Sequence, residues 1–407
     1  MESKMNKKYE ENGKLKSWSE INKERKRKRK EYKEKALENK RMKEMEKEKD
    51  VKQNEKIKSD TEEIKEISTL SIALPGSILE NAQTEELRTY LAGQIARSAC
   101  LYQVDEIIVF DDYGDEEKIK TSSIDDDFGL KTVRQSCGQL ARILQYLECP
   151  QYLRKHFFPI HRDLKYSGLM NPLNAPHHLS SKDQFEYREG VVTSKPIKEG
   201  KGSIVYIGLR QDAHVDKLLV EGSRCTVKLD TKTIDTKKLK GVVVNPEAPR
   251  KTTGVYWGYK VRLAKTLSQI FSQCPYKDGY DLSIGTSDKG SSIDSFECPS
   301  YKHLLVVFGG VQGLEFALEN DQTLKETEPE LLFDSYLNAL PSQGSKTIRT
   351  EEAILITLAG LRSKLNPKFP PTVFKGSDDA NSSASANETI EKVNESTEKA
   401  DEMSRFD

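Results

Sequence analysis

Hydrophobic and polar residues follow two different spacings between Thr69 and Leu365. LSIALPGSIL begins with a short apolar strand that ends at Pro75-Gly76, and VDEIIVFDD holds a continuous apolar run typical of a strand buried on both faces. Two other stretches have helical spacing. The apolar positions of the first are Leu87, Leu91, Ile95 and Leu101, after an N-cap-like start at Thr84, and those of the second are Leu140, Ile143, Leu144 and Leu147. The order strand, helix, strand, helix predicts an α/β domain with a mostly parallel sheet.

This order is interrupted between Phe185 and Pro249, where short alternating segments follow one another without helices. The segments are EGVVTS, GSIVYIGL, SRCTVKLD and KGVVVNP. About five short strands in such a length predict a small antiparallel β-barrel of the OB type. Barrels of this type often bind oligonucleotides, so the insert is a candidate RNA-binding module. A structural appendage or a dimer contact is the alternative, because a fold alone does not define a function.

After Pro249 the α/β pattern resumes. YKVRLAKTLSQIF predicts a helix, DLSIGTSDKG, HLLVVFGGVQGLEFAL and LFDSYLNALPSQGSKTIR each begin with a strand, and TEEAILITLAGLRSKL predicts a final helix. The three strands end in small or turn-forming residues at Gly285-Thr286-Ser287, Gly309-Gly310 and Pro341 to Gly344. Ligands of open parallel sheets bind at the carboxyl ends of the strands. The three loops therefore predict a ligand pocket.

Charge is segregated along the chain, although 65 basic and 65 acidic residues balance over its 407 residues. Residues 1–68 carry 23 basic and 17 acidic side chains, and residues 376–407 carry 3 and 9. Ends this polar bury too little apolar surface to fold. We therefore divide the chain into a charged tail that is disordered or a single helix (1–68), the first part of the α/β domain (69–184), the barrel insert (185–249), the second part of the α/β domain (250–375) and a disordered acidic tail (376–407).

The N-terminal tail contains a dense basic run, with seven basic residues and one acidic residue from Lys23 to Lys30. Such a run is typical of a nuclear localisation signal or of an arm that attracts nucleic acid. A merely solvated tail is the alternative interpretation. The run favours a nuclear protein.

Several classes of protein are not supported. No apolar run is long enough to span a membrane, and the N-terminus lacks the apolar stretch of a signal peptide. The six cysteines contain no C-x-x-C pair, and His161, His177 and His178 lack spaced cysteine or carboxylate partners, so no metal site is predicted. Loop structure or RNA contact suits these histidines better. HRDL at His161 and DFG at Asp127 stand in the wrong order for a kinase, and no P-loop spacing is present.

Two segments carry a resemblance to a known family. VVFGGVQGLEFAL, followed by NALPSQGSKTIRTEEAILITLAGL, is similar to the paired cofactor-binding signatures of the SPOUT superfamily of S-adenosylmethionine-dependent RNA methyltransferases. With LSIALPGSIL, APHHL and the barrel insert, the chain resembles a eukaryotic and archaeal branch of that superfamily that is described as kinetochore-associated. The resemblance extends from about Leu70 to Leu365, and its two signatures are specific only in combination.

The resemblance implies an α/β sheet whose C-terminal loops form a trefoil knot that binds S-adenosyl-L-methionine in a bent shape. Glycines would let the backbone approach this ligand closely, and loop amides would hydrogen-bond adenine. The residues that the resemblance places at the cofactor are Thr286, Ser287, Gly309, Gly310, Leu340, Gln343, Gly344, Thr347, Ile348 and Thr350.

Two arginines are candidates for catalysis. A methyl group on a sulfonium is already activated, so the protein mainly aligns an acceptor and helps remove its proton. For uridine N3, a guanidinium would stabilise the developing negative charge. Arg349 stands where the superfamily often has Asn and is the first candidate, and Arg97 on the first helix is the second. The alternative for either is a surface ion pair, for example with Glu351.

Together these features predict a homodimeric methyltransferase, with uridine N3 in ribosomal RNA as its target and the barrel and basic arm as RNA-binding parts. Ile354, Ile356, Leu358 and Leu361 of the final helix are the predicted dimer surface. The competing hypothesis is a non-catalytic RNA-binding and spindle or kinetochore scaffolding protein that retains the fold. The expected location is the nucleus or nucleolus, with the cytoplasm and the mitotic spindle or kinetochore as further sites.

Overall fold

The computed structural model describes residues 67–114, 134–196, 202–230, 233, 238–325 and 328–365. All of them belong to one compact unit, Lys65–Asp407. The polar insertion after the second predicted strand and most of both predicted tails lie outside the described residues, and so does the basic run from Lys23 to Lys30.

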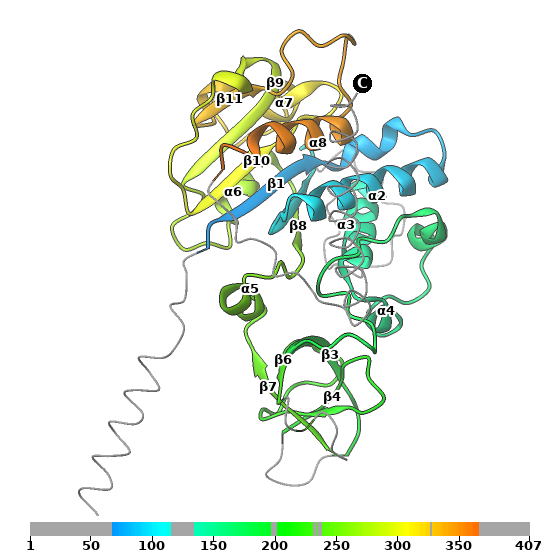
Figure 1. The fold of residues 1–407 in the computed structure, drawn as a ribbon. Helices are drawn as coiled ribbons and strands as arrows, with labels where there is room; N and C mark the ends of the chain where they lie inside the picture. The colour runs from blue at the N-terminus through cyan, green and yellow to red at the C-terminus, as the bar shows by residue number, and fades with distance from the viewer. Residues whose placement is uncertain are drawn as a thin grey trace, which may run out of the picture. The chain divides into compact units, whose positions relative to one another are not determined.

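A six-stranded parallel sheet is the centre of the α/β domain (Figure 1). Each neighbouring pair is parallel, and Ile72 at the centre lies opposite both Val306 and Ile107. The two central strands consist almost entirely of buried residues, as expected for a sheet covered on both faces. In spatial order the strands are β11 (Ser335–Asn338), β9 (Leu282–Ser292), β10 (His303–Val307), β1 (Thr69–Pro75), β2 (Glu106–Phe110) and β8 (Lys260–Ala264).

Helices cover both faces of this sheet. One hydrophobic cluster joins the sheet to α2 (Glu85–Leu101), α3 (Gln135–Glu148) and α8 (Thr350–Leu361). A second cluster joins the opposite face to α6 (Leu267–Ser272) and α7 (Gly313–Glu319). The remaining helices are α4 (Gln151–Phe157), α5 (Ala248–Thr253) and the 3-10 turns η1 (Gly76–Asn81), η3 (Arg162–Leu164), η4 (Ser167–Leu169), η6 (Ile293–Ser295) and η7 (Pro329–Leu331).

The insert forms a closed five-stranded barrel around its own apolar core, which includes Val205, Ile207 and Val227. The predicted α/β class with a mostly parallel sheet and an inserted barrel is confirmed. The barrel is not wholly antiparallel, because β5 pairs with β7 in parallel. The trefoil knot stays a prediction. In order around the barrel the strands are β3 (Tyr187–Val192), β4 (Ile204–Tyr206), β5 (Ala213–His214), β7 (Leu239–Val244) and β6 (Arg224–Leu229).

The helix predicted for YKVRLAKTLSQIF is wrong in its first half. Residues Lys260–Ala264 form the edge strand β8, and only Leu267–Ser272 is helical. Val261 and Leu263 pack on one face of the sheet, and Ala264 packs on the other. This alternation has the two-residue period of a strand, which a count of apolar residues at helical spacing overlooks.

Two further features differ from the sequence prediction, the end of one strand and the buried face of one helix. Strand β9 was expected to end at Gly285, but it continues to Ser292. Its pairing with β11 moves from Gly285 to Ser291 between consecutive partner residues, so 286–290 leave the ladder. On α2, Leu91 and Ile95 are buried as expected, whereas Leu87 and Leu101 are exposed.

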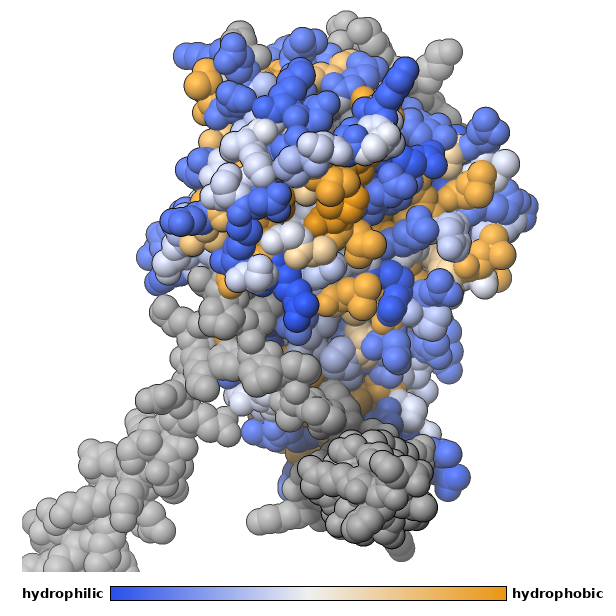
Figure 2. Space-filling view, turned by 45° about the horizontal axis from the view of Figure 1, so that its top comes forward, coloured by the Kyte–Doolittle hydropathy of each residue, from blue (hydrophilic) through white to orange (hydrophobic). Residues whose placement is uncertain are grey.

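The apolar surface predicted on the final helix is largely internal. Ile354, Leu358 and Leu361 are buried in the core of their own chain. Hydrophobic surface is nevertheless exposed on this side of the α/β domain (Figure 2), and α2 and α8 leave Leu87, Leu101 and Leu355 exposed. The prediction of a homodimer therefore loses three of the four residues on which it was based.

Candidate active site

A cavity of about 480 Å³ lies at the ends of β10 and β11, beside the part of β9 that leaves the ladder. Its lining comes from residues 286–289 of β9, from the residues that follow β10 and β11, from the start of α8, and from Asn81 and Leu91 on the neighbouring η1 and α2. The volume is in the usual range for small-molecule sites, and the carboxyl edge of a parallel sheet is where such sites form.

Glycines after β10 let the backbone fold back on itself beside the cavity. A Cβ atom on Gly309 would lie 2.8 Å from the carbonyl carbon of Gly313 and 2.9 Å from the Leu314 nitrogen, which excludes any larger residue without movement of the backbone. The Gly309 carbonyl accepts a hydrogen bond of 3.0 Å from the Thr350 hydroxyl. The first residue of α8 is thereby attached to the end of β10.

Two threonine hydroxyls in the lining differ in their hydrogen bonding. Thr286 donates to the Val307 carbonyl at 3.1 Å, which connects the middle of β9 to the end of β10. Thr357, on α8, is fully buried, and its Oγ1 has no hydrogen-bond partner. A buried hydroxyl without a partner costs free energy, so a polar ligand atom in the cavity would stabilise it.

Most predicted cofactor residues meet in this cavity. Leu340 and Gly344 are not among the lining residues, and Leu340 is exposed. Residues that the sequence analysis missed include Asn81, Leu91, Lys289 and Thr357. The predicted residues that line the cavity are Thr286, Ser287, Gly309, Gly310, Gln343, Thr347, Ile348 and Thr350.

Arg349 also lines the cavity, immediately before α8. Its backbone N–H donates to the Glu352 carboxylate at 3.0 Å, an interaction that holds the helix start. Its side chain is 60% exposed, and its Nε lies 3.4 Å from Glu351 Oε1. An ion pair this exposed is weak, so the guanidinium can turn toward a ligand at little energetic cost.

Arg97 lies elsewhere. It donates to the carbonyls of Leu173 at 2.5 Å and Pro172 at 3.4 Å, and it lines a separate cavity of about 330 Å³ with Cys100 and Tyr256. Helix α2 begins at the carboxyl edge of the sheet and runs toward the opposite edge. Arg97 is near the end of this helix and therefore lies away from the carboxyl edge. Within one chain the structure does not bring the two predicted catalytic arginines together.

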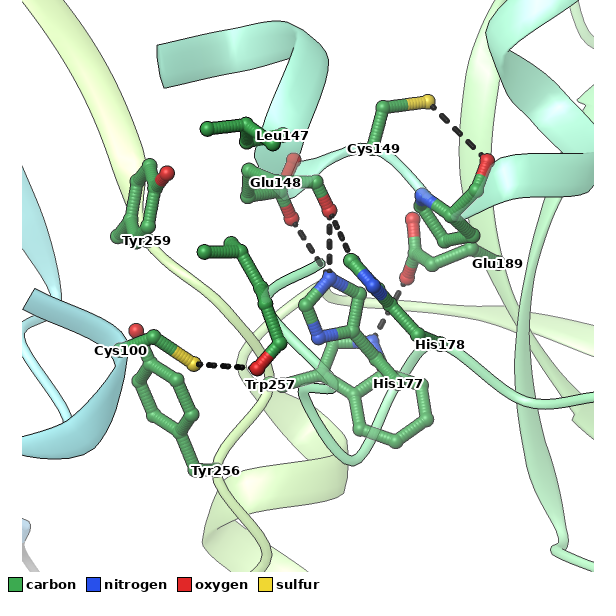
Figure 3. Close-up of polar contacts among 12 residues, drawn as sticks. Cys100, Leu147, Glu148, Cys149, His177, His178, Glu189, Tyr256, Trp257 and Tyr259 are labelled. Carbon is green, nitrogen blue, oxygen red and sulfur yellow. Dashed lines mark hydrogen bonds and ion pairs between the residues drawn. The ribbon is translucent and has the colours of Figure 1, made fainter. Parts of the chain in front are cut away.

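The predicted histidines take structural positions. His177 Nε2 lies 2.8 Å from the Glu148 carbonyl oxygen and 3.1 Å from its Oε1, and His178 Nε2 lies 2.7 Å from the same carbonyl (Figure 3). His161 Nδ1 accepts from the Asp163 N–H at 3.2 Å. Among the described residues no cluster of His, Cys, Asp or Glu has the arrangement of a metal site.

Glu148 is also part of a buried ion network that joins α3 to the barrel. Arg224 on β6 binds both carboxylate oxygens of Glu148 at 2.7 and 3.0 Å, and its Nε binds Glu189 of β3 at 2.8 Å. The second oxygen of Glu189 accepts from Thr226 and from the Trp257 indole at 2.6 and 2.7 Å. Burial alone would raise the pKa of Glu148, but Arg224 and His177 outweigh burial and hold it well below its usual range.

Lowering the pH from 7 to 5 is expected to reduce the free energy of unfolding by about 1 to 2 kcal/mol through His178. Burial, followed by the neighbouring His177, lowers the pKa of His178 from 6.5 to about 3. The unfolded chain therefore binds a proton that the folded chain does not, so this stability is present above about pH 6.5 and is lost as the pH falls. Urea unfolding of wild type and His178→Asn at both pH values measures it. An identical pH dependence in the two proteins would contradict the assignment.

The parallel sheet, the glycine-bounded cavity at its carboxyl edge and the inserted barrel define an α/β protein that binds a small ligand beside a second, barrel-shaped module. None of the helices in the described ranges has the length and apolar character needed to cross a membrane. The model of a family described as "Putative RNA methyltransferase" matches residues 69–361. The chain belongs to this family, and the predicted membership among RNA methyltransferases is confirmed.

Curated relatives cover most of the chain. A 28S rRNA (uridine-N(3))-methyltransferase of Drosophila melanogaster is 51% identical over 363 residues, which cover 88% of this chain and 74% of the relative. Proteins of the same name from Mus musculus and Homo sapiens are 54% and 53% identical over 299 residues. Those matches cover 73% of this chain and 77% and 78% of the relatives.

Proposed function

We propose that this chain transfers a methyl group from S-adenosyl-L-methionine to N3 of a uridine in the RNA of the large ribosomal subunit. The observation that carries the proposal is the cavity at the carboxyl edge of the parallel sheet in a chain of the RNA methyltransferase family. The relatives at 51 to 54% identity, which are named for uridine N3 in 28S rRNA, support this choice of base and atom.

The residues of the cavity fit the cofactor. Gly309 and Gly310 let the backbone that lines the cavity pack closely on its surroundings, and the unpartnered Thr357 hydroxyl supplies a polar contact inside the lining. The segments that line the cavity would hold the ligand through backbone groups and through Thr286, Ser287, Gln343, Thr347, Ile348 and Thr350. When bound, S-adenosylmethionine supplies an activated methyl group.

We propose that the Arg349 side chain contacts the uridine that accepts the methyl group. It lines the cavity with an exposed guanidinium, so its N–H groups can reach a ligand that enters from solvent. Loss of the N3 proton leaves negative charge on the imide oxygens of uridine, and a guanidinium stabilises that charge. Its role is to stabilise the deprotonated base.

The barrel, which we assign to the OB type, has basic and aromatic side chains near its junction with α4. Lys155 lies 5.6 Å from the centre of the Tyr206 ring, and the His156 ring lies 5.4 Å from it. Lys155 and His156 are exposed, and Tyr206 on β4 is half-buried. Base stacking on aromatic rings beside positive charge is the usual way to hold single-stranded RNA. These residues support an RNA-binding role for the barrel.

The test of the proposal combines binding and product analysis. Calorimetry should detect S-adenosylmethionine binding to the purified chain. Incubation with a transcript of large-subunit rRNA, digestion to nucleosides and mass spectrometry should then reveal N3-methyluridine. Binding without any methylated nucleoside would refute the reaction, and methylation of another base would refute the choice of uridine.

Replacing Thr357 by Val is expected to weaken S-adenosylmethionine binding about 3- to 10-fold, the effect of one lost hydrogen bond. The ligand-free protein should be as stable as wild type or more stable, because Val removes a buried hydroxyl without a partner. Calorimetry and urea unfolding measure the two effects.

Thr350→Val is the matched contrast, because it removes a hydroxyl that already bonds the Gly309 carbonyl and should destabilise the ligand-free protein. Unchanged cofactor affinity in Thr357→Val would show that this hydroxyl does not contact the ligand.

We also infer that two chains pair and that the protein acts in the nucleus or nucleolus. Pairing would give Arg97 a role, because it would bring this side chain to the partner's cavity, whereas its own cavity lies out of its reach. Light scattering tests pairing. A mixture of Arg349→Ala and Arg97→Ala proteins tests whether the site is shared. If it is, the mixture should recover part of the activity.

A further inference from the structure

Two acidic residues follow β2 at the same edge of the sheet as the cavity. Asp111 and Asp112 come directly after Phe110, and β2 is separated from β10 only by β1. Both are about 95% buried. Their surroundings differ, and the difference indicates that they have different roles.

Both carboxylate oxygens of Asp111 have partners within the protein. Its Oδ1 accepts from the Tyr113 N–H at 3.1 Å and lies 3.7 Å from Arg134 Nε, and its Oδ2 accepts from the Arg134 N–H at 3.3 Å. These contacts hold the chain where it leaves β2 and where it enters α3. Asp111 therefore has a structural explanation.

Asp112 has one oxygen that the fold does not use. Its Oδ2 accepts a short hydrogen bond of 2.6 Å from the Ser77 hydroxyl, but its Oδ1 is buried and has no hydrogen-bond partner. Burying an unpaired carboxylate oxygen is costly, and such a group in a native structure calls for a functional reason.

The carboxylate also lies against the cavity wall. A Cβ atom on Gly310, which lines the cavity, would be 3.2 Å from Asp112 Oδ2 and 3.3 Å from Ser77 Oγ. A larger residue at this position would have to displace these side-chain atoms by a few tenths of an ångström. Asp112 itself is not among the lining residues, and Gly310, which has no side chain, packs against its carboxylate from the cavity wall.

Burial raises the pKa of Asp112, and the adjacent Asp111 adds to this effect, whereas Ser77 opposes it. Among the described residues, the titratable or charged groups that face it are Asp111, Arg134 and the buried Cys137 thiol. A carboxylate with a raised pKa is a stronger base than a solvated one, which suits proton removal near neutral pH.

We propose that Asp112 is the general base that accepts the N3 proton of the target uridine, an inference that rests on the proposed function. The N3–H bond breaks as an O–H bond forms on Asp112, and the electron pair left on N3 forms the new bond to the methyl carbon. The pair that joined this carbon to sulfur stays with the sulfur. Ser77 is a positioning residue that keeps one carboxylate oxygen in place.

The test uses Asp112→Asn in the full chain, because the amide oxygen can still accept from Ser77 but cannot remove a proton. We expect turnover on large-subunit rRNA to fall at least about 100-fold, the usual contribution of a general base. S-adenosylmethionine affinity should stay within about threefold of wild type. The unfolding midpoint at neutral pH should stay the same or rise, because a buried unpaired charge has been removed.

The pH–rate profile separates a base from a structural group. In wild type the rate should fall as the pH drops through the pKa of Asp112, and the residual rate of Asp112→Asn should lack this step. Asp111→Asn is the control, since it should lower the unfolding midpoint and keep turnover below its own melting range.

Turnover in Asp112→Asn within threefold of wild type would overturn the inference, and so would parallel losses of turnover, cofactor affinity and stability. Wild-type protein that binds cofactor but forms no N3-methyluridine would overturn the proposed function and this inference with it.

Discussion

Replacing Arg349 by Ala is expected to reduce turnover on RNA by about 100- to 1,000-fold, the effect of removing one preorganised group that stabilises charge in a transition state. S-adenosylmethionine affinity should remain within a few fold of wild type. An interaction that strengthens only as the base loses its proton affects kcat and leaves ground-state binding unchanged. The exposed position of Arg349 and its weak pairing with Glu351 mean that the fold does not depend on the side chain.

Two further variants make this prediction specific. Arg349→Lys keeps the charge but not the planar pair of donors, so it should recover only part of the activity. Glu351→Gln removes the ion-pair partner and should leave turnover within a few fold of wild type. Single-turnover kinetics and calorimetry on the same samples separate chemistry from binding. Wild-type turnover in Arg349→Ala would show that the exposed ion pair is the whole role of this residue.

The central strands could be predicted from sequence because their signal is local. Continuous apolar runs identify β1, β2 and β10, and the structure buries each of them almost completely. Strand β8 carries no such run. It includes Arg262, whose Nε binds Glu106 of the neighbouring strand at 2.8 Å across 156 positions of sequence. The residues next to Arg262 in the sequence do not reveal this distant partner. A strand that contains such a charge therefore cannot be recognised from local sequence alone.

The same distinction applies to the cavity. Glycines at strand ends mark places where the backbone must approach something closely, and this local requirement indicated the loops at Gly285 and Gly309. Thr357 gave no such signal, because it reads as a polar residue inside an apolar helix. Its unpartnered hydroxyl becomes apparent only when α8 is packed against the sheet. The position of Arg97 could have been predicted from the sequence, because Arg97 lies about three turns from the start of α2.

Replacing Arg224 by Met is expected to destabilise the protein by about 3 to 5 kcal/mol, because it leaves two buried carboxylates without their positive partner. Glu148 and Glu189 are 7% and 3% exposed, so water cannot replace the guanidinium. Lys195→Met is the matched control on the barrel. It removes the exposed pair with Asp212 and should change stability by no more than about 1 kcal/mol. Urea unfolding measures both variants.

The pH dependence of this loss identifies its cause. Without Arg224, the buried Glu148 has a folded-state pKa above its unfolded value, so the penalty is present at neutral pH and shrinks as this carboxylate becomes protonated in acid. The difference in unfolding free energy between wild type and Arg224→Met should therefore be smaller at pH 5 than at pH 8. Adding Glu148→Gln to Arg224→Met should restore more than about 1 kcal/mol, because residues in one network are not additive. A loss that stays constant with pH and is not reduced in the double variant would mean that Arg224 acts through the packing of its apolar stem, and that the charge contributes little to joining the barrel to α3.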